Sequence, residues 1–264
     1  MIPTPPIVEK KKRKITWKIY KGGPGIKTAQ KNKIIKCFCM DLNAVRAAEL
    51  AGVNRNTADL WYRHFRELIY QATRRAPRLF GEVEMDQAAF GGRGRKKMQA
   101  VLKRLAKKLP HREYMEKAKE VRKEHKTQVF GILQRGGAVY THIIKDQSAR
   151  TLTPIVRMVV EDTATVYTDK WGGFKDLKLD GYTHRSVNHS LEYVAKDGSH
   201  INGIESFWSF AKLRLSAFRG IHVTVLPLHI KECEWRWNIG AEDRSVSAKA
   251  RWARVEKALK ALLI

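Results

Sequence analysis

The sequence has few cysteines, few acidic residues relative to basic ones and no long apolar run. Its cysteines, Cys37, Cys39 and Cys233, are odd in number and lack paired zinc-ligand spacing. We therefore expect neither a disulfide framework nor a zinc ribbon, and we expect a reducing compartment. No apolar run approaches the roughly 18 residues that span a bilayer. The first residues lack the apolar segment of a signal peptide, so neither membrane insertion nor secretion is expected.

Basic residues dominate the charge. The 264 residues include 52 Lys and Arg but only 26 Asp and Glu, which gives a formal charge of +26. A polyanionic partner, and nucleic acid first, is the direct inference. An anionic membrane surface or a purely solubilising charge are the alternatives. The hydrophobic fraction of 43% and the length suit a small accessory domain and one catalytic-sized domain with a real core.

The N-terminal part divides into an arm and a small helical domain. Residues 1–30 are basic and broken by Pro and Gly, which predicts a flexible arm that contacts DNA, although its basic run also resembles a nuclear address. Residues 31–76 predict three helices, near 33–39, 43–50 and 56–70. The break "AGVN" permits a left-handed turn at Gly52 and a helix cap from Asn54 or Asn56.

This pattern is typical of a helix-turn-helix DNA-binding domain, and a helical hairpin that only packs on the next domain is the alternative. The last helix would present its polar residues to DNA. These candidates are Arg55, Asn56, Arg63 and Arg66.

Residues 77–222 have a different sequence pattern, in which short β-like runs alternate with segments of helical spacing. Strands are expected at 81–87, 128–137, 138–146, 165–169 and 183–190, with helices at 148–161, 170–179 and 202–218. This order matches a ribonuclease H-like α/β fold, a mixed five-stranded sheet with flanking helices. Three antiparallel strands followed by parallel additions would place Asp86 and Asp169 on neighbouring strands.

A basic, helical insertion at 93–126 interrupts this domain between the first two strands. Glutamates neutralise its second half, whereas its first half has none, so we expect 93–108 to follow the DNA backbone. A solvated pair of charged helices is the alternative. Residues 223–264 predict terminal helices. The insertion's candidate DNA contacts are Arg93, Arg95, Lys96 and Lys97.

Three carboxylates suggest phosphoryl-transfer chemistry. Asp86 and Asp169 each end an apolar run, and Glu205 lies in a helical segment. Two strand ends and one helix face can bring three carboxylates together, and such oxygen ligands hold Mg²⁺ or Mn²⁺. Two ions would activate the attacking oxygen and stabilise the leaving oxygen of a phosphodiester. Spacing alone does not select these three, because Asp146, Glu82 and Glu84 compete.

Other polar residues surround this predicted site. Lys212 follows Glu205 by two helical turns, so it can hold a phosphate, although an exposed lysine is an equal alternative. His189 and His200 are further candidates for contact with the scissile phosphate. Asn202 either contacts that phosphate or, as we favour, caps the helix. Asp146 suits a cap of the helix that follows it, and Glu82 or Glu84 could support the carboxylates.

Six segments in order resemble the DDE transposases of the Merlin superfamily and their bacterial insertion-sequence relatives. They are "MDQAAFGGRGRKK", "VFGILQRGG", "DQSARTLTPIV", "VYTDKWGGF", "GYTHRSVNHS" and "HINGIESFWSFAK", between about residues 81 and 219. The resemblance implies a ribonuclease H-like domain that cuts at terminal inverted repeats and joins the 3′ ends to target DNA with divalent metal. By position, its acidic triad falls on Asp86, Asp169 and Glu205, and its following basic residue on Lys212.

The chain departs from the family pattern in three ways. Gln87 and Ala88 replace the family's Glu and Thr or Ser after the first acid, the N-terminal zinc ribbon is absent, and the basic insertion is long. End recognition would then depend on the helix-turn-helix and the arm. Some relatives use asparagine as the third ligand, which leaves Asn202 as a weak competitor of Glu205.

We therefore interpret the chain as a DNA transposase that acts on double-stranded DNA as a homodimer or larger assembly. An inactive, domesticated DNA-binding relative and a structure-selective nuclease of similar fold are the alternatives. The intact triad favours catalysis, because a pure binding module gains nothing from clustered acids near phosphate. The helix-turn-helix favours recognition of specific ends. The expected location is the cytoplasm and nucleoid of a bacterium or the nucleus of a eukaryote.

Overall fold

The computed structural model describes residues 26–91, 95–124, 126–169, 182–187, 200–218, 220–240, 243 and 245–263. The chain divides into two compact units between Asp59 and Leu60. Each unit is described by itself.

The first unit contains two helices and the start of a third. They are α1 (Thr28–Cys39), α2 (Ala44–Ala51) and α3 (Arg55–Ala72), of which α3 continues past the boundary. Gly52 ends α2 with a left-handed φ of 65°, as the break "AGVN" predicts. The side chain of Asn54 accepts the Asn56 N–H at 2.8 Å and so caps α3. The helix α1 begins inside the segment predicted as a flexible arm, which corrects that boundary.

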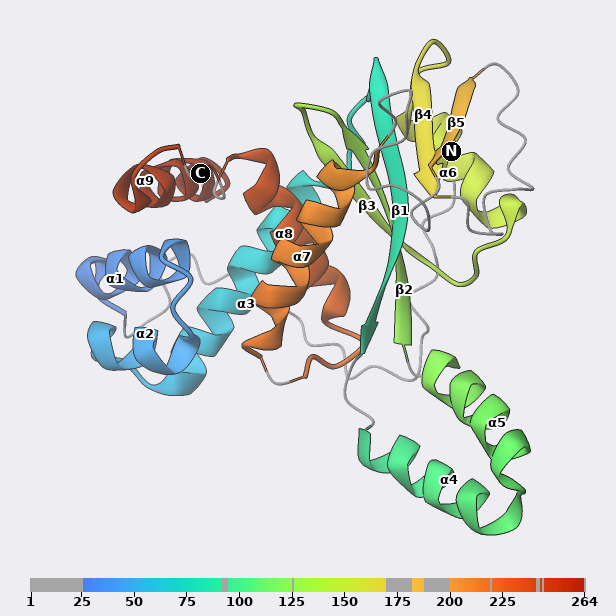
Figure 1. Cartoon of the computed structure of the whole chain (residues 1–264). Coiled ribbons are helices and arrows are strands. Elements are labelled where there is room, and N and C mark those ends of the chain that lie inside the picture. The colour runs from blue at the N-terminus through green and yellow to red at the C-terminus, as the bar shows by residue number, and fades with distance from the viewer. Residues whose placement is uncertain are drawn as a thin grey trace. The chain divides into compact units, whose positions relative to one another are not determined.

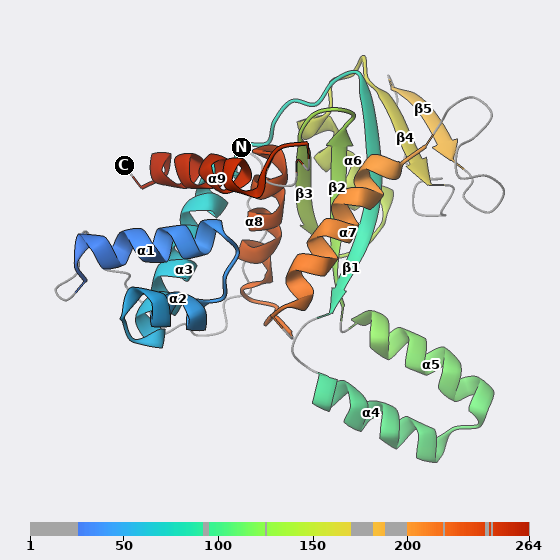
Figure 2. The ribbon, with the colours of Figure 1, turned by 60° about the vertical axis from the view of Figure 1, so that its left-hand side comes forward.

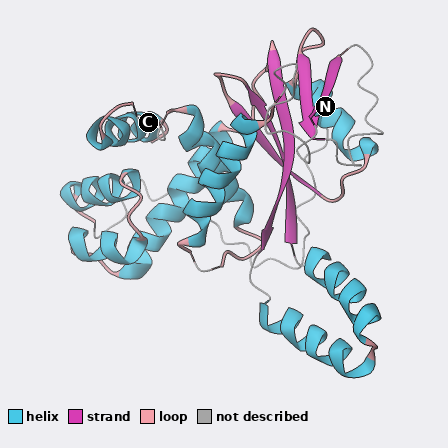
Figure 3. Ribbon diagram, in the orientation of Figure 1, coloured by secondary structure: helices cyan, strands magenta, loops and turns pink. Residues whose placement is uncertain are grey.

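The second unit is built on a mixed five-stranded sheet with the order β3-β2-β1-β4-β5. Strands β1, β2 and β3 are antiparallel, whereas β4 runs parallel to β1 and β5 parallel to β4. This is the predicted ribonuclease H-like arrangement (Figures 1 and 3). The strands are β1 (Glu82–Gly91), β2 (Lys126–Gln134), β3 (Val139–Ile144), β4 (Thr165–Asp169) and β5 (Thr183–Val187).

Helices cover both faces of the sheet. Successive residues of a strand point to opposite faces, and β1 carries apolar residues on each of them. On one face, Val83 and Met85 of β1 pack with α6 (Ala149–Val159). On the other, Ala88 and Phe90 pack with α7 (Asn202–Ser216) and α8 (Leu226–Asn238). Figure 2 shows α7 lying along β1. Residues of β1 that alternate with Val83 and Met85 therefore face α7.

The remaining helices are α4 (Arg95–Lys108), α5 (His111–Glu124) and α9 (Ala248–Ala261). The first two form the predicted helical insertion between β1 and β2, and they contact each other. The helix predicted at 170–179 lies outside the described residues. None of the helices in the described ranges is both long and apolar enough to cross a bilayer.

Candidate active site

The strand register places Asp86 beside Asp169. Met85 of β1 pairs with Thr168 of β4 in parallel register, so the next residue on each strand is an aspartate. Neighbouring strands lie about 4.8 Å apart, and residues in register point to the same face. Both aspartates therefore lie on the face that α7 covers, as the predicted strand order requires.

A glycine next to Asp86 allows α7 to approach the sheet. Gly131 of β2 pairs with Asp86, and a Cβ at this glycine would lie 2.5 Å from Cζ2 of Trp208 on α7. Because real Cβ atoms do not approach so closely, only glycine permits this packing. Glu205 is exposed in the first turn of α7, so the close approach brings the third carboxylate towards the aspartates.

The pKa of Asp86 is influenced by the three other predicted site residues. All causes together raise this pKa from 3.8 to about 6; burial is the largest of them, and a hydrogen bond with the Gln87 backbone opposes the rise. The negative charges of Glu205 and Asp169 raise it further, whereas the ammonium of Lys212 lowers it. The other three predicted residues thus lie within electrostatic range of Asp86.

The donor set fits a hard divalent cation in chemistry and in charge. All three side chains offer carboxylate oxygens, the ligands that Mg²⁺ and Mn²⁺ prefer. A cation would also relieve the repulsion that raises the pKa of Asp86. Among the described residues, however, no three His, Cys, Asp or Glu side chains already stand in a metal-holding arrangement. The metal assignment therefore rests on register, charge and donor type.

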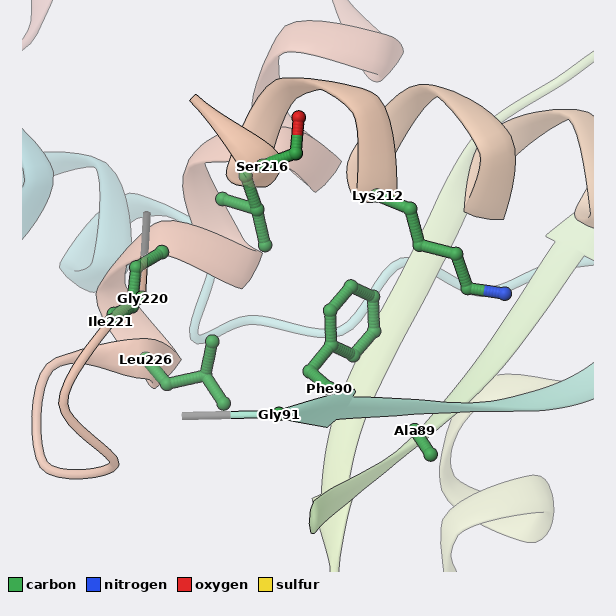
Figure 4. A pocket seen from close by; sticks show the side chains of 9 residues that line it. Ala89, Phe90, Gly91, Lys212, Ser216, Gly220, Ile221 and Leu226 are labelled. Carbon is green, nitrogen blue, oxygen red and sulfur yellow. The ribbon is translucent and has the colours of Figure 1, made fainter. Parts of the chain in front are cut away.

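An open hollow lies beside Lys212, between the end of β1 and the last two turns of α7 (Figure 4). Phe90 and Leu215 give it apolar walls, and Lys212 and Ser216 supply polar groups. Lys212 therefore borders both this hollow and the carboxylates.

Arg135 belongs to the same region, although the sequence analysis did not select it. It follows β2 directly, and its Nε donates to Glu84 Oε1 at 2.9 Å. Glu84 faces α7 with Asp86 and is fully buried, as the predicted alternation on β1 requires. The signal available in the sequence was a single basic residue between an apolar strand and two glycines.

The residues just before α7 have different places from those expected. Asn202 is the first residue of α7 and is exposed, and the N-cap position belongs to Ile201, so the predicted capping role of Asn202 is wrong. His200 places its Nδ1 3.4 Å from Glu84 Oε1. His189 lies outside the described residues.

Asp146 lies two residues before Ser148, which holds the N-cap position of α6, so Asp146 supports the start of this helix without being its predicted cap. Its carboxylate accepts hydrogen bonds from Ser148 and Thr151 at the start of α6. The hydrogen bond from the Ser148 side chain is the largest cause of a pKa lowered to about 2. Asp146 therefore does not compete for the metal role.

The candidate DNA contacts on α3 differ in how far they are exposed and in the residues with which they pair. Arg55 is 69% exposed and pairs loosely with Asp59 at 3.5 Å, and Asn56 is exposed beside it. Arg63 pairs with Glu67 at 2.9 Å and remains 41% exposed.

Arg66 requires a correction. Its Nε donates to the fully buried Glu232 at 2.7 Å, and its side chain is only 11% exposed. Arg214 and Arg236 donate to the same carboxylate. Because removing one partner of a buried ion pair is strongly destabilising, Arg66 is a structural residue and not a DNA contact.

The candidate contacts in the insertion are placed only in part. Arg95, Lys96 and Lys97 form the first turn of α4. Arg93 lies outside the described residues.

A model of the ISXO2-like transposase domain matches residues 78–238, more than half of the chain. The matched segment contains Asp86, Asp169, Glu205 and Lys212. An uncharacterized transposase-like protein of Haemophilus influenzae is 39% identical over 100 residues, which cover 38% of this chain and 80% of that relative.

Proposed function

The chain belongs to the ISXO2-like transposase family, and on that premise we propose that it binds the terminal inverted repeats of a transposon, cleaves at their ends and joins the freed 3′ ends to target DNA. The observation that carries this proposal is the strand register that places Asp86 beside Asp169 on the face towards α7, with Glu205 and Lys212 close enough to influence the pKa of Asp86. A site with these charges can bind metal and phosphate together.

We assign the three carboxylates as ligands of two Mg²⁺ or Mn²⁺ ions. When bound, such an ion pair activates the attacking oxygen and stabilises the departing 3′ oxygen. Asp86, on the central strand of the sheet, would hold the ions together with Asp169 and Glu205. Lys212 binds a phosphate of the processed strand and also moderates the negative charge at Asp86.

The hollow beside Lys212 suits the DNA next to the scissile phosphate. Its apolar walls fit a nucleobase or sugar, and Lys212 fits the adjoining phosphate (Figure 4). Arg55, Asn56 and Arg63 on α3 are proposed contacts for the inverted repeats, and His200 for DNA near the site. Joining two ends requires two active sites, so we propose a homodimer or larger assembly.

Changing the carboxylates tests the catalytic assignment. Asp86→Asn and Asp169→Asn remove a metal ligand charge and keep the size of the side chain. Because such metals supply several kcal/mol of transition-state stabilisation, we expect each change to reduce cleavage and joining by roughly three orders of magnitude. Purified terminal DNA is incubated with the full chain and Mg²⁺ or Mn²⁺, and nicked, cleaved and joined products are resolved on a gel.

Asp146→Asn is the matched control, since it makes the same chemical change at a carboxylate that accepts hydrogen bonds at the start of α6. End binding in a gel-shift assay without metal should survive in all three variants. Joining retained by Asp86→Asn would refute the assignment. Wild-type chain that binds ends but never cuts them would favour a DNA-binding relative, and cutting of branched DNA irrespective of end sequence would favour a structure-selective nuclease.

A further inference from the structure

The three carboxylates come from three separate elements, and one guanidinium contacts two of these elements and the residue that precedes the N-cap of the third. Arg135 reaches β1 through Glu82 at 3.1 Å and Glu84 at 2.9 Å. It lies over the ring of Tyr167 on β4, 3.9 Å from the centroid. Its Nη2 donates at 2.7 Å to the backbone oxygen of His200, just before α7.

Each contact lies close in sequence to one carboxylate. Glu84 precedes Asp86 by two residues, and Tyr167 precedes Asp169 by two residues, so both pairs share the strand face towards α7. His200 leads directly into the turn of α7 that carries Glu205. Glu84, Tyr167 and His200 are thus the supports of the three carboxylates. A shift of Arg135 would move these supports together.

Glu84 fixes the start of α7 to β1. The first N–H groups of a helix have no partner within the helix, and an apolar N-cap residue such as Ile201 has no side-chain acceptor to offer them. Glu84 Oε2 accepts the Ile204 N–H at 2.9 Å instead, so a strand supplies the cap. The positive end of the helix dipole favours this carboxylate. Glu205 is the next residue.

A glycine makes room for this cap. A Cβ at Gly203 would lie 2.8 Å from Glu84 Oε2 and 3.0 Å from Cδ2 of Leu133. The sequence thus keeps the first turn of α7 free of a side chain at the point where the buried carboxylate must approach.

We propose that Glu84 and Arg135 are positioning residues that set the separation of Asp86, Asp169 and Glu205, and so determine the affinity of the site for divalent metal. The proposal rests on the proposed function. A buried ion pair stabilises a fold little compared with apolar packing, so its value here lies in fixing geometry. Partners that orient metal ligands have this effect in other metal sites.

Glu84→Gln tests the ion pair, because glutamine keeps an acceptor for the Ile204 N–H but loses the charge that holds Arg135. Arg135→Lys keeps the charge but loses the planar fork that reaches several partners at once. Mn²⁺ binding to the full chain is measured by the electron paramagnetic resonance signal of free Mn²⁺. We expect either change to weaken binding roughly ten- to hundred-fold. End cleavage should recover as Mn²⁺ is raised, and metal-free end binding should not change.

Glu234→Gln on α8 is the matched control. Glu234 is also buried, and it accepts hydrogen bonds from the Thr141 N–H at 2.8 Å and from the Lys231 ammonium at 2.6 Å. It contacts none of the residues that support the three carboxylates. We expect it to lower thermal stability without changing Mn²⁺ affinity.

The outcomes separate the two proposals. Wild-type chain that binds Mn²⁺ while the folded Glu84→Gln and Arg135→Lys variants bind it equally well would overturn the positioning role alone. Wild-type chain that binds no Mn²⁺ would overturn the two-metal function and the positioning role with it. If Glu84→Gln does not fold, Arg135→Lys and Gly203→Ala, which displaces the Glu84 carboxylate, decide the matter.

Discussion

At the scale of single residues, Asp86 combines a structural cost with a functional requirement. Its pKa of about 6 lies above the ordinary 3.8, chiefly because of burial and secondly because of neighbouring carboxylates. Between these values the folded chain binds the proton more tightly than the unfolded chain does. The metal-free protein therefore loses stability as pH rises from about 3.8 to about 6, and the ionised form that results is the one that the proposed metal site requires.

The raised pKa of Asp86 predicts how the stabilising effect of metal varies with pH. Mg²⁺ should raise the unfolding temperature of the wild-type chain at pH 7.5, and the rise should vanish as pH falls through about 6. Below that pH, metal affinity should fall by about tenfold per pH unit, because one proton competes with the metal at Asp86. Thermal unfolding with and without Mg²⁺, from pH 5 to 8, measures both effects.

Asp86→Asn should abolish the Mg²⁺ effect and, without metal at pH 7.5, should unfold at a higher temperature than wild type, because the buried charge is gone. Asp146→Asn should keep the wild-type Mg²⁺ profile, since the pKa of Asp146 is lowered to about 2, outside this window. A Mg²⁺ effect of equal size at pH 5 and 8 would contradict the role of Asp86.

Sequence patterns predicted residues whose roles follow from local position. Asp169 ends β4 as predicted, whereas β1 continues past the predicted end at 87 to Gly91, so Asp86 lies in the middle of its strand. Alternation along β1 placed Glu84 on the face of Asp86. Arg135 was missed because its partners Glu84 and His200 lie 51 and 65 residues away. Arg66 was misread for the same reason, since Glu232 lies 166 residues away. Local sequence carries no signal for such pairings.

At the scale of elements, alternation and turn residues predicted the five strands and their order around β1. Polarity patterns gave the helical insertion, and the "AGVN" break gave the turn between α2 and α3. The sequence did not show how closely α7 approaches the sheet. That distance depends on Gly131, whose missing side chain admits Trp208.

Gly131→Ala should therefore move α7 away from β1. A Cβ at 2.5 Å from the Trp208 ring overpacks the interface, and overpacking typically costs about 1–3 kcal/mol. We expect a thermal midpoint several degrees lower and a higher Mn²⁺ concentration for half-maximal cleavage, because Glu205 moves with α7.

Gly91→Ala is the control for this change, since a Cβ at this β1 glycine meets no atom within 4 Å. Its stability should stay within about 0.5 kcal/mol of wild type, with an unchanged metal response. A Gly131→Ala variant with wild-type stability and metal response would show that α7 does not depend on this close approach.

At the scale of the whole molecule, the chain carries a formal charge of +26. Two adjacent helices of the insertion differ strongly in their net charge. The helix α4 carries seven basic residues and no acid, whereas α5 carries five basic and four acidic residues. Only three residues separate Gly91 from Arg95, so α4 begins within about 15 Å of the end of β1 at 3.8 Å per residue. A DNA strand that leaves the carboxylates past Lys212 can therefore reach α4.

This asymmetry predicts that α4 and not α5 contacts the DNA backbone. Lys103→Gln with Lys107→Gln removes two exposed charges from α4, and Arg112→Gln with Lys117→Gln removes two from α5. Each lost phosphate contact should reduce the slope of log affinity against log salt by about 0.9, because fewer counterions are released. We expect this reduction for the α4 pair and almost none for the α5 pair, measured by fluorescence anisotropy on nonspecific duplex. Equal slopes in the two variants would mean that net charge, and not the face of α4, determines the binding.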